Sequence, residues 1–309
     1  MAAATLLTLA ETDVRDSIPA AALMAALQTP PFVVVPGTFN TRDLGLLPSL
    51  EEGQGQGQGQ GRAAAGAGAG GAAGAGGQIR PGFIFRTGGL EALARSADGQ
   101  AVLRDTLGVR RIFDLRSREE HARAPDPAVE GVEGVWLGDG AGAEDSPMLP
   151  DLGRFAEGEG EQGYADMYMD VLAKYAGTFR EVLASVRDRP GEPILFHCTG
   201  LLETLAGYDA DTVRADFLLS RIGTEVAREH LLLFATRHIK GVEGGGDGSA
   251  AFDEVPGFLN LVSLKAACWD AFVEAVEGTF GGFEGYATEV LGFSKEDLVT
   301  IKKNLNVAP

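Results

Sequence analysis

Cys198 is the residue in this sequence best placed for nucleophilic chemistry. An apolar run, Ile194 to Phe196, follows the Pro190-Gly191 breaker and leads into His197 and Cys198. This pattern predicts a buried strand, and a helix-like run, Leu201 to Ala206, begins just after it. A thiol that faces a helix N-terminus ionises more easily, with a pKa of roughly 3.5–7.5 in such settings. The alternative is a buried structural cysteine, since free cysteine is among the most buried residue types.

The segment His197-Cys198-Thr199-Gly200 resembles the phosphate loop of the protein tyrosine phosphatases. The most similar branch is that of the tyrosine and phosphoinositide phosphatases of bacteria and fungi, in which the loop reads His-Cys-Thr-Ala-Gly-Lys-Asp-Arg-Thr-Gly. The resemblance implies that Cys198 attacks phosphorus and forms a phosphocysteine, while His197 supports the loop and the pKa of the thiol. It also implies that Thr199 and Gly200 contact the phosphate. That chemistry uses no metal and no cofactor.

The loop departs from the family pattern where the phosphate would be held. The family has an arginine at the sixth position after its cysteine, but Thr204 stands there, and the nearest arginine downstream is Arg214. The loop lysine, aspartate and arginine have no counterpart, and Glu203 is a nearby carboxylate without a clear role. Loss of a transition-state arginine costs roughly 10³–10⁵ in rate where it has been measured in phosphoryl transfer. We therefore expect a very poor phosphatase or none.

Other motifs match the same family. Residues 39–45, 80–88 and 114–117 are similar to its Asn-x-Arg-Asp-Leu-Gly-Gly, Arg-Pro-Gly-x-x-Tyr-Arg-Ser-Gly and Asp-Leu-Arg-Ser motifs, and Leu46 replaces the second glycine of the first. Asp216 and Ser220 fall in a run similar to Asp-Tyr-x-x-Ser/Thr. The resemblance implies that four residues support the phosphate loop: Arg42, Asp43, Asp114 and Arg116.

A surface role is the alternative for these supporting residues. Arg42 and Asp43 could form an ion pair on an exposed turn, and such pairs contribute little stability. Arg116 could lie close to Cys198, or it could pair with Glu119 or Glu120 at the surface.

The expected fold class is α/β, with a cysteine-phosphatase-like, mostly parallel central sheet flanked by helices and a C-terminal helical part. The order helix, Gly108, strand at residues 101–115 is typical of a crossover in a parallel sheet. Apolar runs predict strands at residues 32–35, 83–85, 109–115 and 135–137. Helical spacing predicts helices at residues 164–186 and 264–276, with helix caps at Asp209 or Asp211 and at Ser294 with Asp297.

The domain organisation follows from two changes in composition. Residues 1–30 are predicted to be an N-terminal extension, and residues 31–309 a single phosphatase-like domain. Residues 51–78 consist of Gly-Gln and Gly-Ala repeats with almost no bulky apolar side chain, a composition typical of disorder. The family pattern resumes at Ile79, so we interpret this stretch as a disordered insertion within the domain.

The charge balance restricts the partners. The chain has 26 basic and 44 acidic residues, a net charge of −18, which argues against nucleic acid and anionic membranes as partners. No membrane span is expected. Its two cysteines, Cys198 and Cys268, fit a reducing compartment, so we expect a cytoplasmic protein. No metal-ligand spacing occurs among its four histidines.

Three hypotheses remain open at this stage. The first is a cysteine-dependent phosphatase, impaired by its incomplete loop, that acts on phosphotyrosine proteins or phosphoinositides. The second is a catalytically dead pseudophosphatase that serves as a binding module. The third is that the sequence omits a short coding segment, since both flanks of the gap match the family.

Overall fold

The structure is a computed structural model of the 309-residue chain. It describes residues 1–47, 79–116, 118–138, 151–197, 201–238 and 255–306. Three predicted site residues, Cys198, Thr199 and Gly200, lie outside the described residues, as does the predicted insertion at 51–78.

The strands of the described residues form one sheet in the order β1-β2-β5-β3-β4. The β1 strand runs antiparallel to β2, while β2, β5, β3 and β4 run parallel to one another. This sheet and its covering helices confirm the predicted α/β class with a mostly parallel sheet. The strand bounds are β1 Arg42–Asp43, β2 Ile84–Thr87, β3 Arg111–Asp114, β4 Glu133–Trp136 and β5 Ile194–His197.

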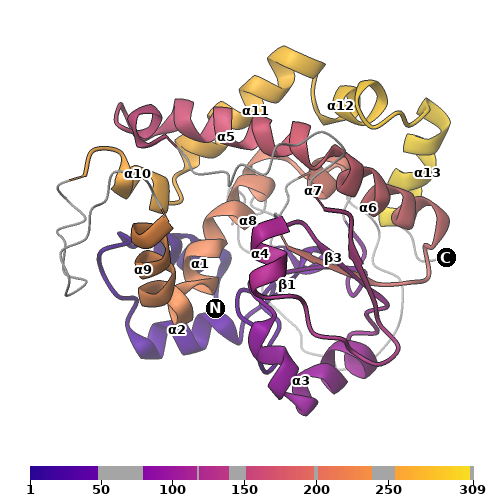
Figure 1. Ribbon diagram of the computed structural model, residues 1–309, viewed down its shortest axis with the longest axis horizontal. Helices are drawn as coiled ribbons and strands as arrows, with labels where there is room; N and C mark the ends of the chain where they lie inside the picture. The colour runs from indigo at the N-terminus through magenta and orange to yellow at the C-terminus, as the bar shows by residue number, and fades with distance from the viewer. Residues whose placement is uncertain (48–78, 117, 139–150, 198–200, 239–254, 307–309) are drawn as a thin grey trace, which may run out of the picture.

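Helices cover both faces of the sheet. Figure 1 shows α5 and α11 running across one side of the molecule, while α3 lies on the opposite side. The N-terminal and sheet-region helices are α1 Ala3–Ala10, α2 Ala20–Leu27, α3 Ala97–Ala101, α4 Arg118–Arg123, α5 Glu161–Lys174 and α6 Ala176–Asp188. The later helices are α7 Leu201–Ala206, α8 Ala210–Gly223, α9 Arg228–His238, α10 Phe258–Val262, α11 Ala266–Phe280, α12 Phe283–Glu289 and α13 Lys295–Asn306. Short helical turns occupy residues 44–46, 91–95, 102–106, 152–155 and 225–227.

The alternation of side chains along the strands separates two apolar cores. On β5, Ile194 and Phe196 belong to the larger core, which contains residues of α5, α6, α8 and the C-terminal helices. Leu195 points to the other face and joins the smaller core beside α3. Because β2 alternates in the same way, Arg86 shares the face of Ile84, the face that α8 covers.

The first 30 residues pack onto the main body of the protein. Leu6 and Ala26 are buried in the larger core, together with residues of α8. Arg221 on α8 donates hydrogen bonds to the carbonyl oxygens of Thr12 at 3.0 Å and Asp16 at 2.8 Å. The N-terminal helices are therefore joined to α8 by both apolar packing and polar contacts.

Two elements differ from the sequence prediction. In place of the strand predicted at residues 32–35, the structure has only one isolated bridge, between Phe32 and Arg42. Prolines at 30, 31 and 36 bracket this stretch and remove backbone donors that a longer ladder would need. The single helix predicted at 164–186 is two helices, α5 and α6, because Tyr175 between them has φ −103° and ψ 18°.

The predicted helix caps are present. The Asp209 carboxylate accepts a hydrogen bond from the Thr212 backbone N–H at 2.8 Å and caps α8. Ser294 and Asp297 form the reciprocal capping box of α13, with bonds of 3.0 and 3.1 Å.

Candidate active site

The middle of the sheet carries the predicted catalytic segment. The β5 strand lies between β2 and β3, with His197 opposite Thr87 and Phe196 opposite Phe113. The central strand therefore ends with His197 at the carboxyl edge of three parallel strands, where open α/β sheets bind their ligands. The α7 helix then begins at Leu201. The strand predicted from Ile194 to Phe196 is present as β5 and ends at His197.

Arg42 is fully buried and joins the N-terminal motif to α8. Its Nε donates to Oδ1 of Asp216 at 2.7 Å, and its Nη2 donates to Oγ of Ser220 at 3.0 Å. Its Nη1 donates to the Asn40 side chain. The alternative prediction, a surface ion pair between Arg42 and Asp43, is therefore wrong. The partner of Arg42 is Asp216 on α8.

Asp43 fixes two loops through backbone hydrogen bonds. Its carboxylate accepts from the N–H of Gly45 at 2.9 Å and from the N–H of Gly82 at 2.7 Å. Burial raises the pKa of Asp43, and these two bonds oppose the rise. A Cβ on Gly45 would lie 2.5 Å from the backbone of Pro81, so the glycine of this motif is needed for the close approach of the two loops.

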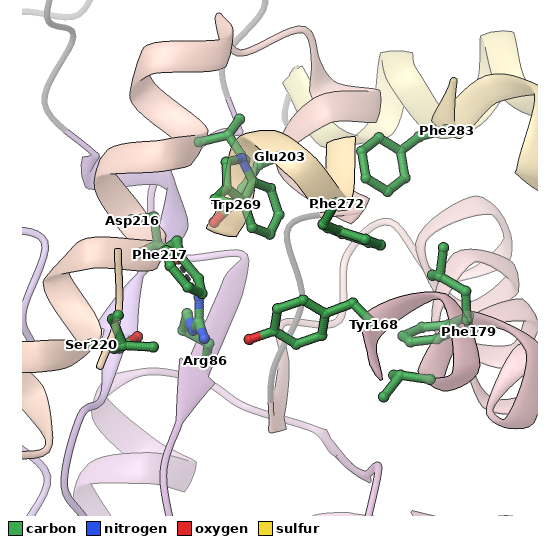
Figure 2. A pocket seen from close by; sticks show the side chains of 14 residues that line it. Arg86, Tyr168, Phe179, Glu203, Asp216, Phe217, Ser220, Trp269, Phe272 and Phe283 are labelled. Atoms are coloured by element: carbon green, nitrogen blue, oxygen red, sulfur yellow. Dashed lines mark hydrogen bonds and ion pairs between the residues drawn. The ribbon is translucent and has the colours of Figure 1, made fainter. Parts of the chain in front are cut away.

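A second arginine and a glutamate complete this buried cluster. Arg86 from β2 donates to Oδ2 of Asp216, and the Glu203 side chain on α7 is also buried against the cluster. Figure 2 shows Arg86, Asp216 and Glu203 on one side of a pocket whose other walls are mainly aromatic. Neither carboxyl oxygen of Glu203 meets a hydrogen-bond donor among the described residues.

The pKa values of the two carboxyl groups of the cluster are shifted in opposite directions. Burial alone would raise the pKa of Asp216, but the charges of Arg42 and Arg86 hold it well below its usual range. Burial raises the pKa of Glu203 well above its usual range, and the negative charge of Asp216 raises it further. Neither oxygen of Glu203 has a hydrogen-bond partner among the described residues. The cluster thus pairs two cations with the Asp216 carboxylate, while burial favours the neutral form of Glu203.

Asp114 and Arg116 form a separate network at the end of β3. The Arg116 guanidinium binds the Asp114 carboxylate at 2.8 and 3.0 Å and Asp126 at 2.7 Å, and it reaches Glu91 at 3.3 Å. His121 Nδ1 lies 2.7 Å from the same Asp114 carboxylate. Burial alone would raise the pKa of Asp114, but the bonds from Arg116 and His121 hold it below its usual value.

The contacts of Arg116 differ from those that the sequence suggested. Asp114 and Glu91 precede α4 in the chain, and Asp126 follows it. The alternative prediction placed the partner on α4 itself. Trp136 on β4 donates from Nε1 to the Arg116 carbonyl oxygen at 3.1 Å and stacks on His121 at 4.1 Å between ring centroids. The turn after β3 is therefore braced by β4 as well as by its own carboxylate.

Comparison with known proteins agrees with this arrangement. The profile of the Tyrosine phosphatase family matches residues 33–307, which include all five strands and the segment after β5. The chain belongs to the tyrosine phosphatase family. A tyrosine-protein phosphatase from Nostoc commune is 24% identical over 228 residues, which cover 70% of this chain and 72% of that protein.

Within the tyrosine phosphatase fold, the motifs at 39–45 and 80–88 meet at the buried Asp216, whereas Asp114 and Arg116 belong to another network. Since the predicted phosphate loop lies outside the described residues, its support by these motifs stays a prediction. Sequence reasoning assigned no role to Asp216 or Glu203. The match of residues 216–220 to a family motif was a signal for Asp216, but a glutamate in a short helical run gave no sign of burial.

The described residues offer neither a metal site nor a membrane span. These residues contain no group of three or more His, Cys, Asp or Glu side chains that could hold a metal ion. None of their helices combines the length and apolarity that crossing a membrane requires.

Proposed function

We propose that this chain hydrolyses phosphomonoesters through Cys198, weakly, by way of a phosphocysteine. The observation that supports this proposal is that His197, which directly precedes Cys198 in the sequence, ends the central strand of a tyrosine phosphatase sheet. His197 supports the loop from its last strand position, and Thr199 and Gly200 supply backbone contacts to the phosphate. A phosphotyrosine protein or a phosphoinositide is the substrate, in a cytoplasmic setting.

The reaction has two steps. The Cys198 thiolate attacks phosphorus, a P–S bond forms, and the bond to the ester oxygen breaks with its electron pair on oxygen. That oxygen takes a proton from solvent, since the loop aspartate of the family is absent. Water then attacks phosphorus, which releases inorganic phosphate and restores the thiolate. Without the loop arginine, both transition states lose a bidentate partner.

The nearby arginines support the proposal of impaired catalysis. Arg86 and Arg116 stand at the ends of the strands that flank β5, but both donate to buried or partly buried carboxylates. Either would have to give up those contacts in order to hold a phosphate. The same observation favours the alternative proposal, a catalytically dead binding module.

A matched pair of cysteine variants tests the enzymatic proposal. Cys198→Ser removes the nucleophile, while Cys268→Ser is the control, because burial raises the pKa of the Cys268 thiol to about 11 and keeps it protonated at neutral pH. We expect slow phosphate release from an aryl phosphate by the unchanged protein and by Cys268→Ser, and none above background by Cys198→Ser. Acid quenching and mass spectrometry should find the phosphoryl group on Cys198. Equal rates for all three proteins would refute the proposal.

Calorimetry separates the two proposals when no turnover is found. A phosphotyrosine peptide and a soluble inositol phosphate are titrated into the unchanged protein, and the unphosphorylated peptide is the control. Heat with the phosphorylated ligands alone would support a binding module. No heat at millimolar ligand, together with no turnover, would reject both proposals.

A further inference from the structure

A pocket on the helical side of the sheet is enclosed mainly by aromatic rings. Tyr168 of α5, Phe217 of α8, and Trp269 and Phe272 of α11 form a closed circuit. Neighbouring ring centroids in it are 6.4 Å apart for Tyr168–Phe217, 5.5 Å for Phe217–Trp269, 5.4 Å for Trp269–Phe272 and 5.2 Å for Phe272–Tyr168. Figure 2 shows these rings around the pocket, with Arg86 and Glu203 at its polar side.

Glu203 is the unusual group in this wall. Its side chain is only 1% exposed, it lines the pocket, and neither carboxyl oxygen accepts a hydrogen bond from another described residue. Burial favours the neutral form of this carboxyl group, in which the carbonyl oxygen is a buried acceptor. A buried acceptor without a partner destabilises the folded protein, so a ligand that donates a hydrogen bond here would remove that cost.

We propose that this pocket binds a small neutral aromatic molecule with one hydrogen-bond donor, of the phenol type, whose ring packs among Tyr168, Phe217 and Phe272 and whose donor bonds Glu203. The proposal goes beyond the phosphatase proposal, because the ligand carries no phosphate and the site is formed by the helical layer. A cationic amine fits less well, because the charges of Arg42 and Arg86 lie in the same cluster as Glu203.

The size of the pocket agrees with a single ring. Its volume is about 90 Å³. An apolar cavity of roughly 150 Å³ binds benzene, so this smaller pocket has room for at most one ring. A ligand with two fused rings would require the helices to move.

Titration of the full chain with three probes tests the class of ligand. The probes are phenol, fluorobenzene of nearly the same shape without a donor, and benzylammonium. Binding is followed by the fluorescence of Trp269 in a Trp136→Phe background, which leaves a single tryptophan, since the chain has two. We expect phenol to bind with a Kd on the order of 1 mM, about 3–10-fold tighter than fluorobenzene.

Two variants place the site. Glu203→Leu should remove the preference for phenol over fluorobenzene, and Val171→Phe, which adds a ring to the pocket wall on α5, should weaken both probes. Circular dichroism checks that each variant is folded. Three outcomes would overturn the proposal: no phenol binding by the folded protein, an unchanged preference in Glu203→Leu, or tighter binding of benzylammonium than of phenol.

Discussion

Replacing Glu203 with glutamine should stabilise this protein at neutral pH. The residue is buried beside Asp216 and has a raised pKa, so the folded chain keeps a proton that the unfolded chain releases above a pKa of about 4.3. From that pH up to the pH at which folded Glu203 ionises, this residue lowers the free energy of unfolding by about 1.4 kcal/mol per pH unit. Glutamine has nearly the same shape and is neutral at every pH.

The sign of the effect depends on which group titrates. The pKa of Asp216 is lowered, so its contribution to stability is present above its unfolded-state pKa of about 3.9 and is lost only in more acidic solution. A comparison between about pH 4.5 and 7 therefore isolates Glu203. We expect Glu203→Gln to exceed the unchanged protein by ~1–3 kcal/mol at pH 7 and by progressively less as the pH falls toward 4.5.

Urea unfolding followed by circular dichroism measures this difference. Midpoints are recorded at several pH values with a common slope for both proteins. Glu274→Gln, an exposed substitution on α11, is the matched control and should leave the midpoint nearly unchanged. If the Glu203→Gln and unchanged proteins keep the same difference in stability at every pH, Glu203 does not hold a proton in the folded state.

Three further substitutions test the contacts that hold the fold. Asp216→Asn should cost ~3–5 kcal/mol because it leaves the buried Arg42 and the partly buried Arg86 without their carboxylate. The exposed control Asp211→Asn should cost less than ~1 kcal/mol, and similar losses for both would contradict the cluster. Ser294→Ala should cost ~1 kcal/mol through loss of the α13 cap, read from the urea midpoint, and no loss would exclude a stabilising cap. Tyr286→Phe should cost ~1 kcal/mol, because its buried hydroxyl donates to the Leu172 carbonyl oxygen at 2.6 Å; an unchanged midpoint would refute this.

The sequence located the elements that carry the catalytic segment because their signals are local. A breaker, three apolar residues and His197 sufficed to place β5, and Asp209 and Ser294 are caps that act within three residues. The strand predicted at residues 32–35 was wrong. The β-branched side chains there favour a strand, but the flanking prolines limit the ladder to one bridge.

The polar cluster depends on contacts that are distant in the chain. Arg42 and Asp216 are separated by 174 positions, and nothing near Arg42 indicates that its partner lies there and not at Asp43. The burial of Glu203 follows from the way α7 packs between the sheet, α8 and the C-terminal helices, which a helical run of six residues does not reveal.

The short α7 helix and its surroundings agree with the hypothesis that the sequence omits the part of the phosphate loop that carries Lys, Asp and Arg. The helix has six residues, its buried Glu203 lacks a donor partner among the described residues, and the pocket of about 90 Å³ adjoins it. A chain that had lost a loop and part of a core helix would be left with features of this kind, since a closely packed core closes only partly around lost atoms.

Restoring the loop tests this idea by gain of function. Replacement of Gly200 by Ala-Gly-Lys-Asp-Arg-Thr-Gly should raise phosphate release by at least ~10³, because it returns the phosphate clamp and the acid to a scaffold that still holds Cys198 after β5. The same insert with Met in place of its arginine is the control and should recover little. Sequencing of the messenger RNA across the codons for residues 196–206 tests whether the transcript encodes the absent loop. Extra codons for Lys, Asp and Arg are the expected result. A folded insertion variant without added activity would instead mean that the scaffold around Cys198 has lost more than its loop.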